Sequence, residues 1–508
     1  MKILKEILII SFLAGVFTSC KKQLLDINVS PNDPTTVSAS SALVLPNALN
    51  TTAAIYDNAT AGNNNFAFAG IWLGHISYSG NYAIATENIS YQLTNNFASG
   101  AFANLYNNIE DYDFVEKKGL ADGNGFYRAI GMLMKAYNYQ TLVDLYNDVP
   151  YTQALQGFAA NKPSYDPGRT IYDDLAKRID TATSLLKLAL SGNTSITGDI
   201  MFNGDAGQWI NFANTVKLRL LLRQSEVNGA AAQTQAAALS GGFLTADADV
   251  NPGYLNSAGK TNPFWGQNIN TNGTYTQDLY RAGAYGIKFY QNNNDPRLAR
   301  FYVPASATGL FTGNYFGDQG VPNSKTSTIG PGVLQAFSQP AVVMSAAESY
   351  FLQAEAALRG WITGDPMALY QSGVTASFVY VGANYPPLRN AANTADSITY
   401  TPSTSAQKYY SQPGNNQTTW AATTSFQDKL ALIIRQKWAS EAWINELEPY
   451  NDYRRLHLPA DIPLSTSIYS TGIFPNRILY PQREYDVNSA NVLKEGNITP
   501  GSKIWWIP

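Results

Sequence analysis

Histidine and cysteine, the residue types that most often ligate metals or assist nucleophiles, are scarce in this chain. Its 508 residues include two histidines, His75 and His457, and one cysteine, Cys20. One cysteine cannot form a disulfide within the chain, and three such residues cannot make a zinc site of four Cys and His ligands. A nucleophile could use only one of two widely separated histidines. We therefore expect no catalytic residue, no metal and no cofactor.

Carboxylates could serve a glycosidase or a calcium site. A glycosidase needs two carboxyl groups about 5 Å or about 6.5–9.5 Å apart, a separation that sequence cannot show. Those on helical stripes, where capping or ion pairing is the ordinary role, are Asp173, Asp174, Glu348, Glu355 and Glu441. The run Asp247-Ala-Asp249-Val-Asn251 opens like a calcium loop, but Pro252 and Ala258 stand where Gly and Glu are required. A solvated turn is favoured, and calcium near Asp247 stays an alternative.

The segment from Gly253 to Thr261 looks like a phosphate-binding loop. Five residues separate Gly253 from Gly259, where the motif requires four. Because Asn262-Pro263 follows, we expect no helix N-terminus facing a phosphate, and we reject the motif.

The N-terminus carries a targeting signal. Lys2 and Lys5 precede an apolar run from Ile7 to Phe17, which is too short for the about 20 residues of a membrane span. The small residue Ser19 stands before Cys20, so residues 1–19 are predicted to be a signal peptide. The placement resembles the lipobox of bacterial lipoproteins, with Phe17 in place of the usual Leu. Cys20 is the predicted lipidation site, and acyl chains would hold the protein on the outer membrane.

The charge balance excludes a class of partner. The chain has 34 Lys and Arg against 37 Asp and Glu, and charged residues make up 14% of it, below the roughly 25% of ordinary soluble domains. Nucleic-acid binding needs a basic surface, so we expect no nucleic-acid partner. Uncharged polar and aromatic residues occupy the positions that charged residues hold in ordinary soluble domains.

Apolar residues recur at helical spacing after a polar, proline-broken tether at residues 20–40. The predicted helical stripes lie in residues 126–147, 171–186, 209–220, 345–359 and 428–447. Segments rich in Asn, Gly, Pro, Ser and Thr lie between them, and are predicted to be long loops: 251–277, 297–339 and 384–420. Loops of this length are uncommon unless they are functional. We expect one mainly α domain over residues 41–508, a helix-pair scaffold that carries long loops and minor β elements.

Several blocks, in order along the chain, resemble the SusD/RagB family of nutrient-binding outer-membrane lipoproteins, in particular its SusD-like branch. The most specific is Ala136 to Tyr151, which is similar to the family's "L…YGDVPY" with Asn147 in place of Gly. The other blocks are Leu25–Pro34, Ile171–Leu175, Trp209–Arg219, Asp295–Leu298, Glu348–Trp361, Gln436–Trp438, Asp452–Arg455 and Pro475–Pro481.

The resemblance implies a tetratricopeptide-like helical core and a binding role without enzymatic activity. Such proteins sit on the cell surface, capture a glycan or a peptide, and cap a SusC-like TonB-dependent β-barrel transporter. An oligosaccharide is the favoured ligand, and a peptide stays an alternative. A surface glycoside hydrolase and a structural or adhesive lipoprotein are the competing hypotheses from other classes.

A sugar site should combine aromatic faces, which cover sugar C–H groups, with amides that bond hydroxyls. Two regions qualify, 63–91 and 264–316, because their rings have Gly, Asn and Ser neighbours that suggest exposure. The predicted ligand-binding residues are Tyr78, Asn81, Tyr82, Trp265, Asn270 and Tyr275. Each ring could instead be buried in the hydrophobic core or contact the transporter. For the tryptophans in apolar stretches or on helical stripes the core is favoured: Trp72, Trp209, Trp438 and Trp443.

Overall fold

The computed structural model describes residues 39–57, 66–318, 320–384 and 400–508. The predicted signal peptide, Cys20 and the tether as far as residue 38 lie outside the described residues.

Long helices form the body of the molecule. They are α2 (Ser41–Tyr56), α5 (Gly100–Ala121), α6 (Gly125–Tyr146), α7 (Gly168–Ser191), α8 (Ala206–Arg223), α13 (Ala346–Leu358), α14 (Pro366–Val381) and α16 (Phe426–Ser440). Helices adjacent in sequence pack against each other: α5 on α6, α6 on α7, α7 on α8, and α13 on α14. This stacking of antiparallel neighbours is the helix-pair architecture that was predicted.

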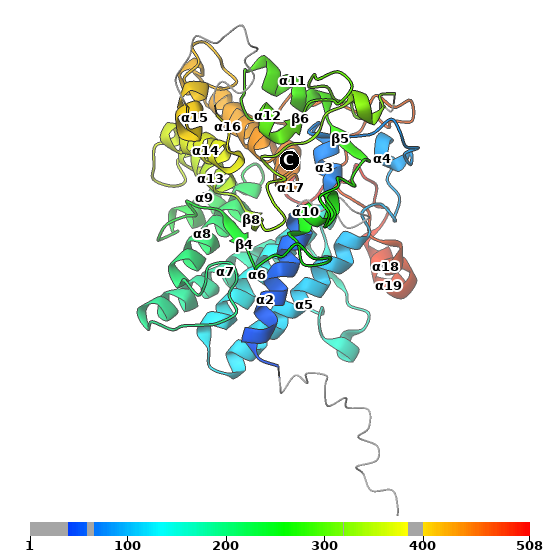
Figure 1. Cartoon of the computed structure of the whole chain (residues 1–508). Coiled ribbons are helices and arrows are strands. Elements are labelled where there is room, and N and C mark those ends of the chain that lie inside the picture. The colour runs from blue at the N-terminus through cyan, green and yellow to red at the C-terminus, as the bar shows by residue number, and fades with distance from the viewer. Residues whose placement is uncertain (1–38, 58–65, 319, 385–399) are drawn as a thin grey trace, which may run out of the picture.

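Figure 1 shows the first stack, α2 and α5 to α8, in the lower part of the view, with α13 to α16 above it. The α5–α6 crossing depends on glycines, because a Cβ on Gly119 or Gly131 would lie 2.6 Å from the backbone nitrogen of Arg128 or Glu116. Asn124 begins α6, since its Oδ1 accepts hydrogen bonds from the N–H groups of the first helical turn.

Short helices lie between and after the long ones. They are α3 (Ala67–Trp72), α4 (Glu87–Ser90), α9 (Gly229–Ala237), α10 (Pro263–Asn268), α11 (Ala284–Asn292), α12 (Leu298–Phe301), α15 (Pro402–Tyr410), α17 (Leu447–Leu456), α18 (Gln482–Val487) and α19 (Ser489–Val492). The 3₁₀ turns are η4 (Gly157–Ala160), η5 (Asn323–Lys325), η7 (Trp420–Ala422) and η8 (Leu493–Glu495).

The strands are short and form two-stranded antiparallel pairs. The pairs are β1 (Ile76–Tyr78) with β5 (Tyr280–Ala282), β2 (Val149–Pro150) with β3 (Tyr165–Asp166), β4 (Ala248–Val250) with β8 (Ala341–Met344), and β6 (Tyr302–Val303) with β7 (Thr328–Ile329). They tie the long loops to the helical body.

Several sequence expectations about helix positions were wrong. The segments 297–339 and 384–420 were predicted to be loops, but they contain α12 and α15. The stripe at 428–447 is not one helix: α16 ends at Ser440, and Trp443 takes a left-handed backbone (φ 63°) before α17 begins. The buried carboxylate of Glu446 accepts a hydrogen bond from the Trp443 N–H at 2.9 Å and satisfies this turn. A helix also starts directly after Asn262, where none was expected, because Pro263 suits a first helical position and Asn262 caps it.

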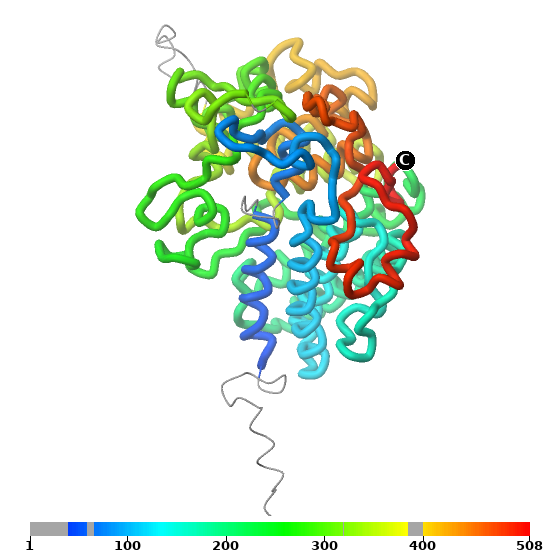
Figure 2. The backbone as a smooth tube through the Cα atoms, turned by 90° about the vertical axis from the view of Figure 1, so that its right-hand side faces the viewer, coloured from blue at the N-terminus to red at the C-terminus, as the bar shows by residue number. Residues whose placement is uncertain are grey.

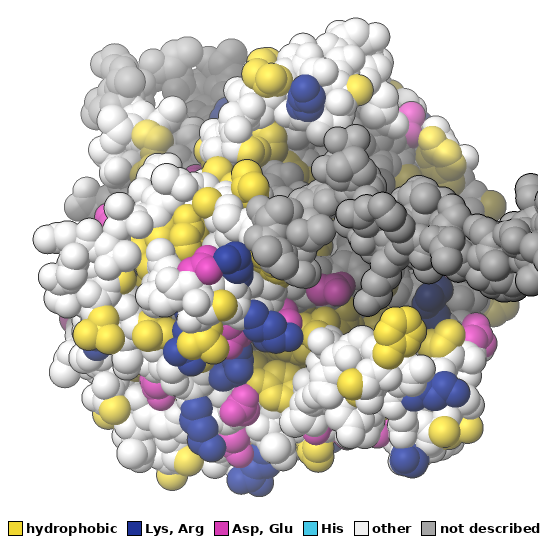
Figure 3. Space-filling view, turned by 90° about the horizontal axis from the view of Figure 1, so that it is seen from below, with side chains coloured by type: hydrophobic (Ala, Val, Ile, Leu, Met, Phe, Trp, Pro, Cys, Tyr) yellow, Lys and Arg dark blue, Asp and Glu magenta, His cyan; other side chains and the backbone are white. Residues whose placement is uncertain are grey.

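Figure 3 shows the lower face, where positively charged Lys and Arg side chains are interspersed with negatively charged Asp and Glu side chains. Ion pairs also join neighbouring helices, such as Lys135 with Asp113 at 2.5 Å and Arg178 with Glu116 at 2.5 Å. Within the described ranges, every helix is too short or too polar to cross a bilayer.

Candidate ligand-binding site

The β1–β5 pair brings the two predicted binding regions together. Tyr78 lies opposite Tyr280 in the register, with ring centroids 5.6 Å apart. The chain then leaves β1 through Ser79 to Tyr82, while a hairpin closed by the bridge between Ile269 and Tyr275 precedes β5. We call the surface made by residues 79–82, 269–275 and 321–328 the loop face.

A hydrogen-bond network fixes the floor of the loop face. The guanidinium of Arg281, on β5, donates from Nε to Thr326 Oγ1 at 3.0 Å and from Nη2 to the carbonyl of Asn323 at 2.9 Å. The Asn323 N–H donates to Asn81 Oδ1 at 3.3 Å. Arg281 is almost fully buried, and burial lowers the pKa of its guanidinium. The network makes the backbone under Asn81 and Tyr82 a fixed support rather than a free loop.

The hairpin is tied to the same support. The hydroxyl groups of Tyr275 and Thr328 lie 2.7 Å apart, and burial raises the pKa of Tyr275. Asn270 Oδ1 accepts from the Thr274 N–H at 2.8 Å, which closes the hairpin turn and leaves the Asn270 amide group exposed.

The six predicted residues differ in exposure. Tyr82 is 45% exposed, and Asn81 and Asn270 are also exposed. Tyr275 and Trp265 are half-buried and pack against the core, although exposure was expected for them. Tyr78 is 8% exposed, so the expectation of an exposed ring is wrong for it, because the ring packs on Tyr280. Of the four predicted rings, Tyr82 offers the most open surface.

A cavity of about 760 Å³ adjoins the hairpin. Its walls come from the loop 252–261 and from α10 with the residues that follow it, and they include Gln267, Asn270 and Lys260. The ring of Tyr254 lies in the wall, and its hydroxyl donates to Asn50 Oδ1 at 3.0 Å. Amide groups and backbone therefore line this cavity, and they can exchange hydrogen bonds with ligand hydroxyls.

Sequence reasoning missed Arg281 and Asn323, which hold the loop face together. It also missed Tyr469, a 55% exposed ring on the loop 463–473. That loop lies beside the segment after β1, since the Thr471 N–H donates to the Ser90 carbonyl at 3.1 Å (Figure 2). No local sequence pattern marks these residues, because their placement depends on pairing between distant segments.

The tryptophans assigned to the core are buried, with Trp72, Trp209, Trp438 and Trp443 each at most 1% exposed. The carboxylates of Glu348 and Glu355 on α13, and of Glu441 just after α16, are buried too and serve as partners within the fold. Glu355 accepts from both terminal nitrogens of Arg455, at 2.6 and 2.7 Å, and this pairing holds the pKa of Glu355 at about 2. Such pairing compensates the cost of burying charge.

The segment that starts at Asp247 was expected to be a solvated turn, but it leads directly into strand β4, and Asp247 is half-buried. Its Oδ1 accepts a hydrogen bond from the Ala346 N–H at 2.7 Å, in the first turn of α13, and burial raises its pKa. In the ranges that the structure covers, no three His, Cys, Asp or Glu side chains are grouped to hold a metal ion. The six-residue α10, which follows the former phosphate-loop candidate, is capped by its own Asn262 side chain.

The structure is thus a helical body that carries a loop-built face with exposed aromatic and amide side chains. Residues 31–481 match a protein family described as starch-binding and associating with the outer membrane, SusD-like_2, and the chain belongs to this family. None of the curated proteins compared with the sequence matches it.

Solved structures with the same fold span nearly the whole chain. A chitin-binding protein is 25% identical with a TM-score of 0.72, over 92% of this chain and 99% of that one. A SusD-like protein from Bacteroides thetaiotaomicron VPI-5482 is 24% identical with a TM-score of 0.71, over 91% and 98%. A chitin-binding SusD homologue from Flavobacterium johnsoniae is 22% identical with a TM-score of 0.73, over 91% and 98%. The predicted family and fold class are confirmed.

Proposed function

We propose that this protein is a cell-surface lipoprotein that binds an oligosaccharide on the loop face and delivers it to a SusC-like TonB-dependent transporter. The observation that carries the proposal is Tyr82, an open aromatic ring beside amide groups on a fixed support, in a chain of a starch-binding family. A sugar ring would place its C–H face on Tyr82 and its hydroxyls toward Asn81, and Asn270 on the neighbouring hairpin would bond a further part of a longer ligand.

Binding to the isolated protein should be weak, with Kd near 1 mM or about −4 kcal/mol, because one open face buries only one side of a ligand. A transporter that covers the face would add a second wall of contacts and raise the affinity. The chitin-binding names of two similar structures make chitin fragments the first ligands to try.

A screen of glycans and peptides against the detergent-solubilised full chain tests the ligand class. We expect binding of a β-linked or α-linked glucan or chitin fragment. Binding of peptides with no glycan bound would contradict the proposal and favour the peptide alternative. Release of reducing ends from a bound glycan would instead indicate a hydrolase.

Purification from membranes of the native host tests the partner. We expect a β-barrel transporter to co-purify, through an interface above about 2,000 Å² as in permanent assemblies. Recovery of the native protein only as a monomer would count against this partner, and would favour an adhesive or structural role.

A further inference from the structure

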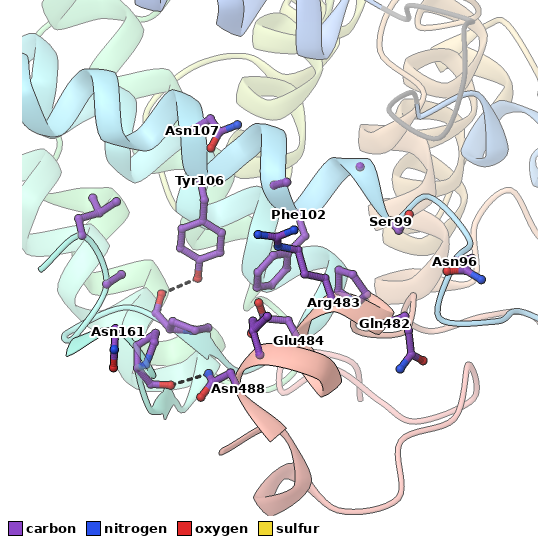
Figure 4. A pocket seen from close by; sticks show the side chains of 18 residues that line it. Asn96, Ser99, Phe102, Tyr106, Asn107, Asn161, Gln482, Arg483, Glu484 and Asn488 are labelled. Atoms are coloured by element: carbon purple, nitrogen blue, oxygen red, sulfur yellow. Dashed lines mark hydrogen bonds between the residues drawn. The ribbon is translucent and has the colours of Figure 1, made fainter. Parts of the chain in front are cut away.

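A second cavity lies outside the loop face. It has a volume of about 500 Å³ and lies between α5, the loop 150–163 and α18, and we call it the α5 cleft (Figure 4). Figure 2 shows the C-terminal segment that contains α18, in red, lying against α5. A volume of this size falls within the range of small-molecule sites in proteins.

Aromatic and apolar side chains form the floor of the α5 cleft. Phe102 and Tyr106 are separated by one turn of α5, and their ring centroids lie 4.8 Å apart. Both rings point from the helix toward the opposite loop (Figure 4). The Tyr106 hydroxyl donates to the Pro150 carbonyl at 2.5 Å, which fixes its ring. Leu155, Val487 and several alanine and proline residues add to the apolar lining. Such a floor suits the C–H face of a sugar ring.

Polar side chains with unused hydrogen-bonding capacity surround this floor. Asn96, Asn107, Asn161 and Arg483 line the cleft and are exposed, and none of their side chains bonds to another residue in the described part of the chain. Their amides can donate and accept hydrogen bonds, and the guanidinium can donate them, without breaking a contact of the fold.

The walls of the α5 cleft are tied together. The Tyr165 hydroxyl donates to Glu484 Oε2 at 2.6 Å, and Asn488 Nδ2 donates to the Pro163 carbonyl at 2.8 Å. The Gln482 N–H donates to the Asn95 carbonyl at 3.2 Å, which joins α18 to the segment before α5. A ligand would therefore enter a cleft that is already formed and would lose little free energy in ordering it.

We propose that the α5 cleft is a second binding site, for a short neutral saccharide, that works independently of the loop face. An apolar aromatic floor with amide groups at the rim is the chemistry that recognises a sugar ring. A docked protein would need about 800 Å² of surface on each partner, far more than the lining of a cleft of about 500 Å³ provides. The proposal adds a site to the proposed function and does not depend on Tyr82.

The test separates the two sites with variants of the detergent-solubilised full chain. Ala103, an exposed residue of α5 that lines the cleft, allows Ala103→Trp to fill its mouth. Ala231→Trp, at an exposed position near the start of α9, is the matched control. Each Trp variant is made in a Tyr82→Ala background, and cellobiose, maltose and N,N′-diacetylchitobiose are titrated to about 10 mM, ten times the expected Kd.

We expect at least one disaccharide to bind the Tyr82→Ala protein, and Ala103→Trp to weaken that binding about tenfold while Ala231→Trp leaves it unchanged. Asn107→Ala, which removes an exposed amide and no packing, should weaken it by a smaller factor. Binding that Ala103→Trp leaves intact overturns the second site, as does failure of all three disaccharides to bind Tyr82→Ala. In the latter case, binding to the Tyr82 protein alone would still support the loop face.

Discussion

Nδ1 of His75 lies 2.8 Å from Oε2 of Glu446, and both side chains are fully buried. The His75 ring stacks on Trp438 of α16 with centroids 4.2 Å apart, and its carbonyl accepts from the Gly283 N–H at 2.8 Å. His75, the residue just before β1, is thus held by Glu446 and Trp438 of the helical body and by Gly283, which directly follows β5. The strand that leads to Asn81 and Tyr82 is positioned by this pair.

The first prediction concerns this pair. Glu446→Ala should lower the free energy of unfolding by about 3–5 kcal/mol, because it leaves the His75 ring nitrogen and the Trp443 N–H buried without an acceptor. Glu446→Gln keeps an acceptor and should cost less. Urea unfolding of both variants measures the difference. A Glu446→Ala protein as stable as the wild type would show that the pair contributes nothing.

The helical body could be predicted from the sequence because each helix carries its own apolar period. The stripe at 126–147 became α6, with Asn124 and the turn after Tyr146 as its ends. The stripe at 428–447 failed as one helix, because apolar residues continue at helical spacing across the turn at Trp443. Periodicity shows which residues are buried, but not where a backbone turns within a buried run.

The loop face could be predicted only in part. Tyr82 and Asn81 are exposed, as their polar neighbours suggested. Tyr78 has the same neighbours and is buried, because β1 pairs with a strand far along the chain and places Tyr78 on Tyr280. The register of such a pair is a tertiary property that local composition does not carry.

Tyr82 is the cleanest test of the loop face. Tyr82→Ala should raise the Kd for the glycan found in the screen at least about fivefold, or roughly 1 kcal/mol, since it removes the exposed ring. The melting temperature should stay nearly unchanged, because an exposed side chain contributes little to folding. The control is Phe426→Ala, which removes a ring of similar exposure (41%) at the start of α16. Equal affinity of the two variants would place the site elsewhere.

The lipid anchor stays a prediction, since Cys20 lies outside the described residues. Cys20→Ala should move the protein from the membrane fraction to the soluble fraction, because removing the cysteine removes the acylated residue. Fractionation should be done in a strain without the transporter, which could otherwise retain the protein. Tight membrane association of the variant in that strain would contradict lipidation.

Asp57, at the C-terminal end of α2, should make stability depend on pH. Burial raises the pKa of its carboxyl to about 7, although hydrogen bonds from the Asn262 side chain and the Phe264 backbone oppose the shift. The folded protein then holds a proton that the unfolded chain has lost, so this group lowers stability as pH rises from about 4 to about 7.

Asp57→Asn removes this titration and keeps an oxygen that can accept from Asn262 Nδ2, which lies 3.1 Å from the carboxylate. We expect the variant to gain stability relative to the wild type as pH rises from 5 to 8, by on the order of 2 kcal/mol. Urea unfolding at each pH measures the gain. Asp173→Asn, at an exposed position of α7, is the matched control and should show no such trend. A stability difference between Asp57→Asn and wild type that stays constant from pH 5 to 8 would show that Asp57 is already ionised in the folded protein at pH 5.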